Sequence, residues 1–105
     1  MTEPNTMQDN LIFLKELQDL LETRKSQMPE GSYTSKLFAS GIDKIAQKVG
    51  EEAIETVIAA KNNSTDELVY ESADLIYHLI VLLQNQGITI DQIVDELATR
   101  HNKEK

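Results

Sequence analysis

Five carboxylates stand at helical spacing in two of the most apolar stretches of this chain. The stretch KVGEEAIE (48–55) holds three glutamates, and ESADLIYH (71–78) holds a glutamate and an aspartate three residues apart. Residues three or four apart lie on the same side of an α-helix. Each stretch therefore presents its acids as a stripe. The five acids are Glu51, Glu52, Glu55, Glu71 and Asp74.

A hard divalent cation is the simplest partner for such stripes. Several carboxylates cannot all stay ionised in a low-dielectric environment without cations. Mg²⁺ and Mn²⁺ prefer carboxylate oxygens, keep water ligands and bind the phosphates of a substrate. The two stripes together predict a metal-dependent phosphate site. The alternative is a solvated charged face, which fits poorly because Lys48 precedes Glu52, the less favourable order for such a pair.

Basic residues gather immediately before the acids. Half of the ten lysines and arginines lie between residues 24 and 48, where they could contact an anion held beside a metal. Two of them share the acidic side of the predicted helix, and their alternative role is simple screening of the glutamates. The candidates for contacting phosphates are Arg24, Lys25, Lys44 and Lys48.

The segment PEGSYT (29–34) offers hydroxyl groups and one aromatic ring to a ligand. Ser32, Tyr33 and Thr34 are candidates for contacting the base or ribose of a substrate. Equally, Ser32 or Thr34 caps the short helix that follows. His78 continues the stripe of Glu71 and is expected either to orient a neighbouring group by a hydrogen bond or to take part in the chemistry.

Helices must position all of these side chains. Apolar residues recur with the helical period, and no segment alternates at the period of two that a strand requires. Ser64 with Glu67, and Thr89 with Gln92, have the spacing of capping boxes that begin helices. The predicted elements span about 9–26, 42–62, 65–86 and 90–101, with a short helical turn at 35–40.

The helix over 42–62 is expected to separate charge from apolar surface. At about 100° per residue, Lys44, Lys48 and the three glutamates share one side. The helix over 65–86 is apolar most of the way round, so other helices must enclose it. We expect one all-α domain over 1–105, with flexible ends at 1–9 and 102–105. The side opposite the glutamates should hold Ile42, Ile45, Val49, Ala53 and Val57.

The composition excludes several classes of protein. The formal charge of −8 argues against binding nucleic acid or anionic membranes. The absence of cysteine excludes a disulfide framework and a thiolate zinc site. The longest strongly apolar run, at 75–83, is too short to span a bilayer. A cytoplasmic location is expected.

The acidic pattern resembles that of the all-α nucleoside triphosphate pyrophosphatases related to MazG. The ordered segments RK, PEGSYT, KVGEEAIE and ESADLIYH narrow the resemblance to the phosphoribosyl-ATP pyrophosphatases, over about residues 10–101. This resemblance implies a helical bundle of four to five helices that is completed by dimerisation. It also implies the second step of histidine biosynthesis, in which 1-(5-phosphoribosyl)-ATP is hydrolysed to 1-(5-phosphoribosyl)-AMP and pyrophosphate. The chain is expected to be the stand-alone form.

The same resemblance assigns roles to the acids. It implies Mg²⁺, with Mn²⁺ as a substitute, held by Glu52, Glu55, Glu71 and Asp74, with Glu51 as a further candidate ligand. Glu51 or Glu55 is expected to take the proton from the attacking water. Two rival interpretations are a house-cleaning pyrophosphatase for other nucleotides and a non-catalytic acidic adaptor.

Overall fold

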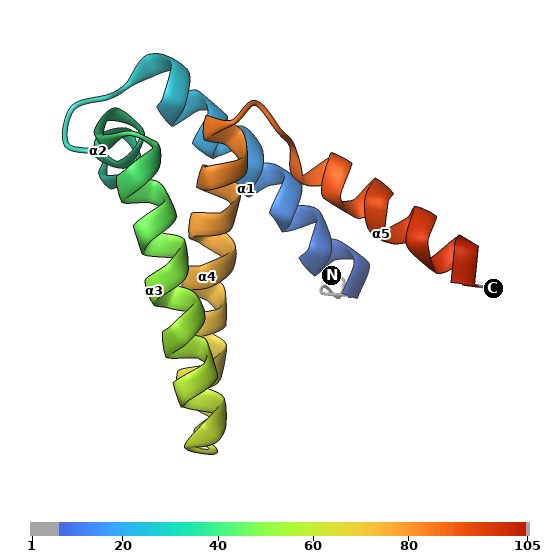
Figure 1. Ribbon diagram of the computed structural model, residues 1–105. Helices are drawn as coiled ribbons and strands as arrows, with labels where there is room; N and C mark the ends of the chain where they lie inside the picture. Colours follow the sequence, from blue (N-terminus) through green and yellow to red (C-terminus); the bar gives the residue numbers. More distant parts are fainter. Residues whose placement is uncertain (1–6, 105) are drawn as a thin grey trace, which may run out of the picture.

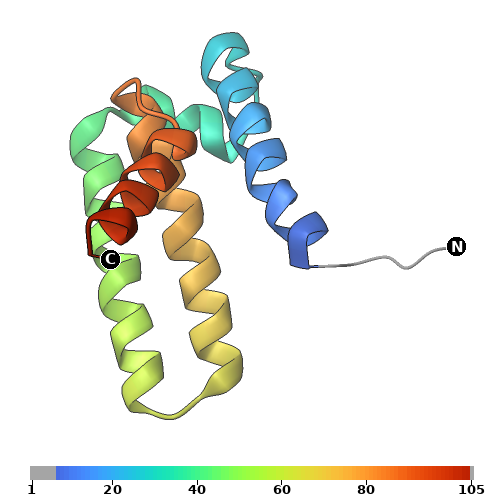
Figure 2. The same cartoon turned by 90° about the vertical axis from the view of Figure 1, so that its right-hand side faces the viewer.

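Two antiparallel helices form the largest packed unit of the fold. The computed structural model describes residues 7–104, and within them α3 (Ile42–Lys61) and α4 (Thr65–Asn85) make the most extensive contact. Figures 1 and 2 show the two helices side by side, joined by a short turn at the lower end. The turn includes Asn63 at φ 57°, a conformation that asparagine tolerates better than most residues. We call this pair the α3–α4 hairpin.

Caps fix where the later helices begin. The Ser64 hydroxyl accepts a hydrogen bond from the backbone N–H of Glu67 at 3.3 Å, which opens α4. Thr89 and Gln92 exchange hydrogen bonds between side chain and backbone at the start of α5 (Ile90–Glu104). The predicted capping box at Thr89 is therefore confirmed, whereas at Ser64 the predicted cap is present but the Ser64 N–H donates to the Ala59 carbonyl and not to Glu67. Both caps satisfy N–H groups that a helix terminus otherwise leaves without partners.

The remaining helices pack at the end of the hairpin opposite the turn. α1 (Met7–Gln27) and the short α2 (Tyr33–Ser40) both contact α4 there. Gly41 at φ 90° lets the chain turn from α2 directly into α3. α5 extends away from the hairpin in Figure 1. Its start is held by an ion pair of 2.6 Å between Lys15 and Asp91 and by the Gln18 side chain, which accepts from the backbone N–H of Ile90.

The hydrophobic core is small and lies at this same end. Leucine and phenylalanine side chains of α1 and α2 meet the start of α3 and the end of α4, and Ile45 and Val81 are completely buried. In the part of the chain that the structure describes, the lower half of the hairpin has no third helix beside it, as Figures 1 and 2 show. The buried core residues are Leu21, Leu37, Phe38, Ile45, Ile80 and Val81.

The predicted helices are present, and the described residues contain no strand. The short turn expected at 35–40 is a complete helix that begins at Tyr33, and α5 continues to Glu104 rather than ending near 101. α1 already begins at Met7. The rest of the ends predicted to be flexible, 1–6 and 105, lies outside the described residues. No helix of the described chain is both long and apolar enough to cross a membrane.

One prediction about α3 is wrong. Ile45 was expected opposite the glutamates, but Ile45, Glu52 and Ala59 together form the buried side of α3. Seven residues make nearly two complete helical turns, so these side chains point the same way, toward α4. Glu52 consequently lies on the packing seam between the two helices and not on an outer face.

Much apolar surface remains exposed. Among the described residues, fifteen large hydrophobic side chains are exposed and seven hydrophobic side chains are buried. The radius of gyration is 15.7 Å, whereas about 13 Å is typical of a compact domain of this length. The exposed set includes a group on the two helices of the hairpin: Ile54, Val57, Ile58, Val69, Tyr70 and Ile76.

Candidate metal and phosphate site

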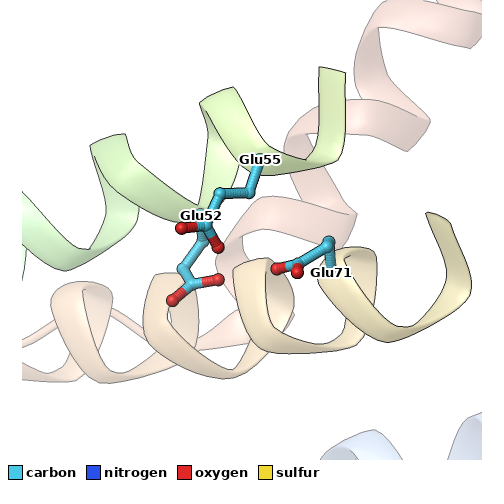
Figure 3. A group of neighbouring side chains, drawn as sticks. All are labelled: Glu52, Glu55 and Glu71. Carbon is cyan, nitrogen blue, oxygen red and sulfur yellow. The ribbon is translucent and has the colours of Figure 1, made fainter. Parts of the chain in front are cut away.

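Three of the predicted acids meet between the two helices of the hairpin. Glu52 and Glu55 project from α3 and Glu71 projects from α4, and one carboxylate oxygen of each lies within 4.8 Å of the others. Figure 3 shows the three side chains directed into the space between the helices. Antiparallel packing produces this meeting, because it sets the middle of α3 against the second turn of α4. We call these three residues the carboxylate group.

Burial makes it unfavourable for all members of the carboxylate group to be ionised at once. Glu52 is only 6 % exposed, and its Oε1, like the Oε1 of Glu71, is buried without a hydrogen-bond partner. Loss of solvent, followed by the neighbouring carboxyl groups of Glu55 and Glu52, raises the pKa of Glu71 to about 7. Within residues 7–104, the one cation that forms an ion pair with this group is Lys48, whose Nζ lies 3.7 Å from Oε2 of Glu52. One lysine cannot neutralise three acids.

These features fit a hard divalent cation. Buried carboxylate oxygens without partners are costly, and such oxygens are the ligands that Mg²⁺ and Mn²⁺ prefer. Glu52, Glu55 and Glu71 supply oxygens from two directions, while the exposed side of Glu55 leaves room for water and a phosphate. The chemistry of this donor set therefore matches a magnesium site open on one side.

The other two predicted acids lie next to this group and not within it. Asp74 is half-buried one turn after Glu71 on α4, and its oxygens do not join the mutually close set. Glu51 is exposed on α3, where it accepts a hydrogen bond of 2.9 Å from Gln47 and lies 3.9 Å from Lys48 Nζ. Both positions are one helical turn or less from a member of the carboxylate group along the chain.

His78 connects α4 with the first residue of α2. Its Nδ1 lies 2.9 Å from the backbone carbonyl of Asp74, and its Nε2 lies 2.9 Å from the Tyr33 hydroxyl. A carbonyl only accepts, so Nδ1 carries a proton, and in the neutral imidazole Nε2 then accepts from the Tyr33 hydroxyl. The imidazole is 5 % exposed. These two hydrogen bonds hold Tyr33 against α4, and whether His78 takes part in the chemistry stays a prediction.

The hydroxyl groups of PEGSYT are largely engaged within the protein. Ser32 accepts from the backbone N–H of Ser35 at 3.1 Å and caps α2, which is the alternative that its sequence position allowed. Thr34 is buried and hydrogen-bonded to the Tyr77 hydroxyl. Tyr33 alone of the three candidates is well exposed, at 52 %. Tyr77, which sequence reasoning did not select, was marked only by its place directly before His78.

The basic residues predicted to contact phosphates do not all lie at one site. Lys25 donates to the backbone carbonyl of Gln84 at 2.7 Å, so it ties α1 to the end of α4. Arg24 lines a cavity of about 540 Å³ together with Pro29, Tyr33 and Tyr77. This cavity has an aromatic and aliphatic wall, and the exposed Leu20 also lines it. Arg24 therefore stands at a place suited to a base or sugar, and Lys25 does not.

Lys44 and Lys48 do lie together beside the acids. They line a second cavity, of about 370 Å³, which Glu51 also borders. Lys36 of α2 lines the same cavity and was missed as a candidate, although it belongs to the basic segment between residues 24 and 48. Only the contact between α2 and α3 brings it there. The structure thus joins a cationic cavity to a carboxylate group through Lys48.

Comparison with known proteins places the chain in a family. The sequence profile of the family "Phosphoribosyl-ATP pyrophosphohydrolase" matches residues 14–101. The chain is 52 % identical over 90 residues to the phosphoribosyl-ATP pyrophosphatase of Lactiplantibacillus plantarum, with 86 % of this chain and 85 % of that protein covered.

Two longer relatives are named histidine biosynthesis bifunctional protein HisIE. The chain is 56 % identical over 95 residues to the protein from Bacteroides thetaiotaomicron and 48 % identical over 95 residues to that from Bacillus subtilis. Each alignment covers 90 % of this chain but only 47 % and 46 % of the relatives, so the chain spans about half their length. The profile match and these identities show that the chain belongs to the phosphoribosyl-ATP pyrophosphohydrolase family.

Proposed function

We propose that this chain hydrolyses 1-(5-phosphoribosyl)-ATP to 1-(5-phosphoribosyl)-AMP and pyrophosphate, the second step of histidine biosynthesis. The observation that carries the proposal is the match, along most of both chains, to a relative named for this activity. The carboxylate group and the adjoining lysines supply the functional groups that hydrolysis of a phosphoric anhydride needs. The cytoplasmic location stays a prediction.

The metal is part of the proposal. Glu52, Glu55 and Glu71 would hold Mg²⁺, or Mn²⁺ in its place, and Asp74 would join through its position one turn further along α4. When bound there, the ion would neutralise phosphate charge and lower the pKa of a coordinated water. The orphaned oxygens of Glu52 and Glu71 support this assignment.

Carboxylates of the protein would then orient the attacking water and take its proton. Glu51 and Glu55 are the two candidates for taking the proton of the attacking water, since both are exposed at the border of the carboxylate group. Glu51→Gln should lower kcat and leave Mg²⁺ affinity nearly unchanged if Glu51 is the base. Glu55→Gln should lower both, because Glu55 belongs to the mutually close oxygens.

The decisive experiment is a substrate panel. Purified protein should turn over phosphoribosyl-ATP in the presence of Mg²⁺, and Glu52→Gln should abolish turnover while circular dichroism shows an unchanged helical content. Faster hydrolysis of free ATP, dCTP or dUTP would overturn the proposal in favour of a general nucleotide pyrophosphatase. Full activity in both Glu52→Gln and Asp74→Asn would overturn the proposed ligand set.

We also propose a homodimer. The α3–α4 hairpin, with Ile54, Val57, Ile58, Val69, Tyr70 and Ile76 exposed, is suited to packing against a second copy. Because a two-helix layer cannot enclose these side chains, a second hairpin would complete a bundle. Analytical ultracentrifugation should give twice the monomer mass, and Val57→Glu should shift the protein toward monomer. A monomeric wild-type protein at micromolar concentration would refute the assignment.

A further inference from the structure

The 370 Å³ cavity between α2 and α3 has an unusual balance of charge. Three lysines line it: Lys36 from α2, and Lys44 and Lys48 one turn apart on α3. Lys48 forms ion pairs with Glu51 and Glu52. Among the described residues, Lys36 and Lys44 have no carboxylate within 4.0 Å. Glu51 also lines the cavity, but it faces Lys48 at 3.9 Å. In a chain of net charge −8, two further cations without such partners, one on each side of the cavity, favour an anionic ligand.

The neutral polar groups of this cavity are already used. The Tyr33 hydroxyl donates to His78, and the Gln47 amide donates to Glu51. The Ser40 hydroxyl donates to a backbone carbonyl of its own helix. Besides the second N–H of the Gln47 amide, the groups left to donate are the ammonium groups, each of which has three N–H donors and no acceptor. The complementary ligand is therefore multiply anionic and rich in acceptors, which describes a diphosphate better than a base or a sugar.

The carboxylate group next to the cavity indicates which part of a substrate the cavity binds. Lys48 Nζ lies 3.7 Å from Oε2 of Glu52, so the cavity borders the carboxylate group directly. A polyphosphate that binds beside these carboxylates can continue into the cavity. Resting on the activity proposed above, we propose that this cavity binds the diphosphate part of the substrate, the part released as pyrophosphate, and that Lys36 is one of the residues that contact it.

Direct binding tests this assignment without measuring catalysis. Isothermal titration calorimetry would follow pyrophosphate binding to the wild-type protein and to Lys36→Ala, Lys36→Arg and Lys61→Ala. Lys61 is the matched control, because it is an exposed lysine at the opposite end of α3. Loss of one charge-assisted contact should weaken pyrophosphate binding in Lys36→Ala by about tenfold. Lys36→Arg should restore most of the affinity, and Lys61→Ala should bind like the wild type.

A second titration separates the two phosphate ends of the substrate. Ribose 5-phosphate carries the same chemistry as the phosphoribosyl end, and it should bind more weakly than pyrophosphate and respond little to Lys36→Ala. Tighter binding of ribose 5-phosphate, lost in Lys36→Ala, would overturn the diphosphate assignment. Equal pyrophosphate affinities in the wild type and Lys36→Ala, or no binding to the wild type, would overturn the site itself.

The outcome is distinguishable from that of the proposed function. A wild-type protein that leaves phosphoribosyl-ATP intact, but loses pyrophosphate affinity in Lys36→Ala, would refute the activity and support the site. In an active enzyme, Lys36→Ala should raise the inhibition constant of pyrophosphate by about the same tenfold as the binding constant. A rise in Lys61→Ala of equal size would contradict a specific role for Lys36.

Discussion

Metal binding should depend on pH because of one carboxyl group. Without metal, burial and the acids Glu55 and Glu52 raise the pKa of Glu71 to about 7. A carboxylate must lose its proton before it binds a metal. The ionised fraction of Glu71 is about 0.09 at pH 6, about 0.5 at pH 7 and about 0.9 at pH 8. The apparent Mg²⁺ affinity should therefore fall about tenfold between pH 8 and pH 6.

Calorimetry in buffers of different ionisation enthalpy measures how many protons the protein releases when Mg²⁺ binds, which reports the same pH dependence. Binding of one Mg²⁺ at pH 7 should release about half a proton from Glu71. A carboxyl group with an ordinary pKa near 4.3 would release almost none at this pH. Glu71→Gln should abolish the release and weaken binding. Glu67→Gln is the matched control, because Glu67 is exposed one turn earlier on α4 and should leave the pH dependence unchanged.

The same pKa has a consequence for the metal-free protein. The folded-state pKa of Glu71 lies above the unfolded value, so the protonated form favours folding. This contribution is fully present below about pH 4.3 and is lost as the pH rises through about 7. Relative to Glu71→Gln, the wild type should lose thermal stability between pH 5 and pH 8, and Mg²⁺ should restore it mostly at the upper end. Equal Mg²⁺ affinity at pH 6 and pH 8 would refute this reasoning.

Three further substitutions test the packing and the caps. Ile45→Ala should lower the free energy of unfolding, measured by urea denaturation, by about 2–5 kcal/mol, because Ile45 is completely buried. Ile42→Ala is the control, because that side chain is 43 % exposed, and it should lower the free energy of unfolding by less than half as much. Ser64→Ala should cost about 1 kcal/mol through loss of the α4 cap, and Ser64→Asp should retain the stability; an unchanged midpoint for Ser64→Ala would contradict the cap. Tyr33→Phe should cost about 1–3 kcal/mol by leaving the buried Nε2 of His78 without a donor, and an unchanged melting temperature would contradict that hydrogen bond.

Local signals made the helices predictable. Capping residues such as Ser64 and Thr89 act within four residues of the chain, so their spacing is readable in the sequence. The side of α3 that is buried was less predictable, because periodicity alone does not say that a glutamate shares the seam with Ile45. The buried carboxyl group of Glu52 is an exception to the rule that hydrophobic residues are the ones buried.

The candidate site was predictable where it depended on spacing within a helix. Glu52, Glu55 and Glu71 meet as expected, since the turn at Ser64 folds the two stripes together. The basic residues were harder to place, because their positions depend on contacts between distant helices. Lys25 is drawn to the end of α4, whereas Lys36 joins the acids only because α2 folds against α3.

The separation of the core from the carboxylate group bears on the dynamics of the hairpin. Below the core, α3 and α4 are held chiefly by each other, so this half should open locally at a lower free energy than the whole protein unfolds. An ion held by Glu52 and Glu71 would link the two helices and act as a brace. Amide hydrogen exchange should then slow on Mg²⁺ addition around these two residues and stay unchanged near Ile80. The cofactor would thereby set the rigidity of the half of the molecule in which it works.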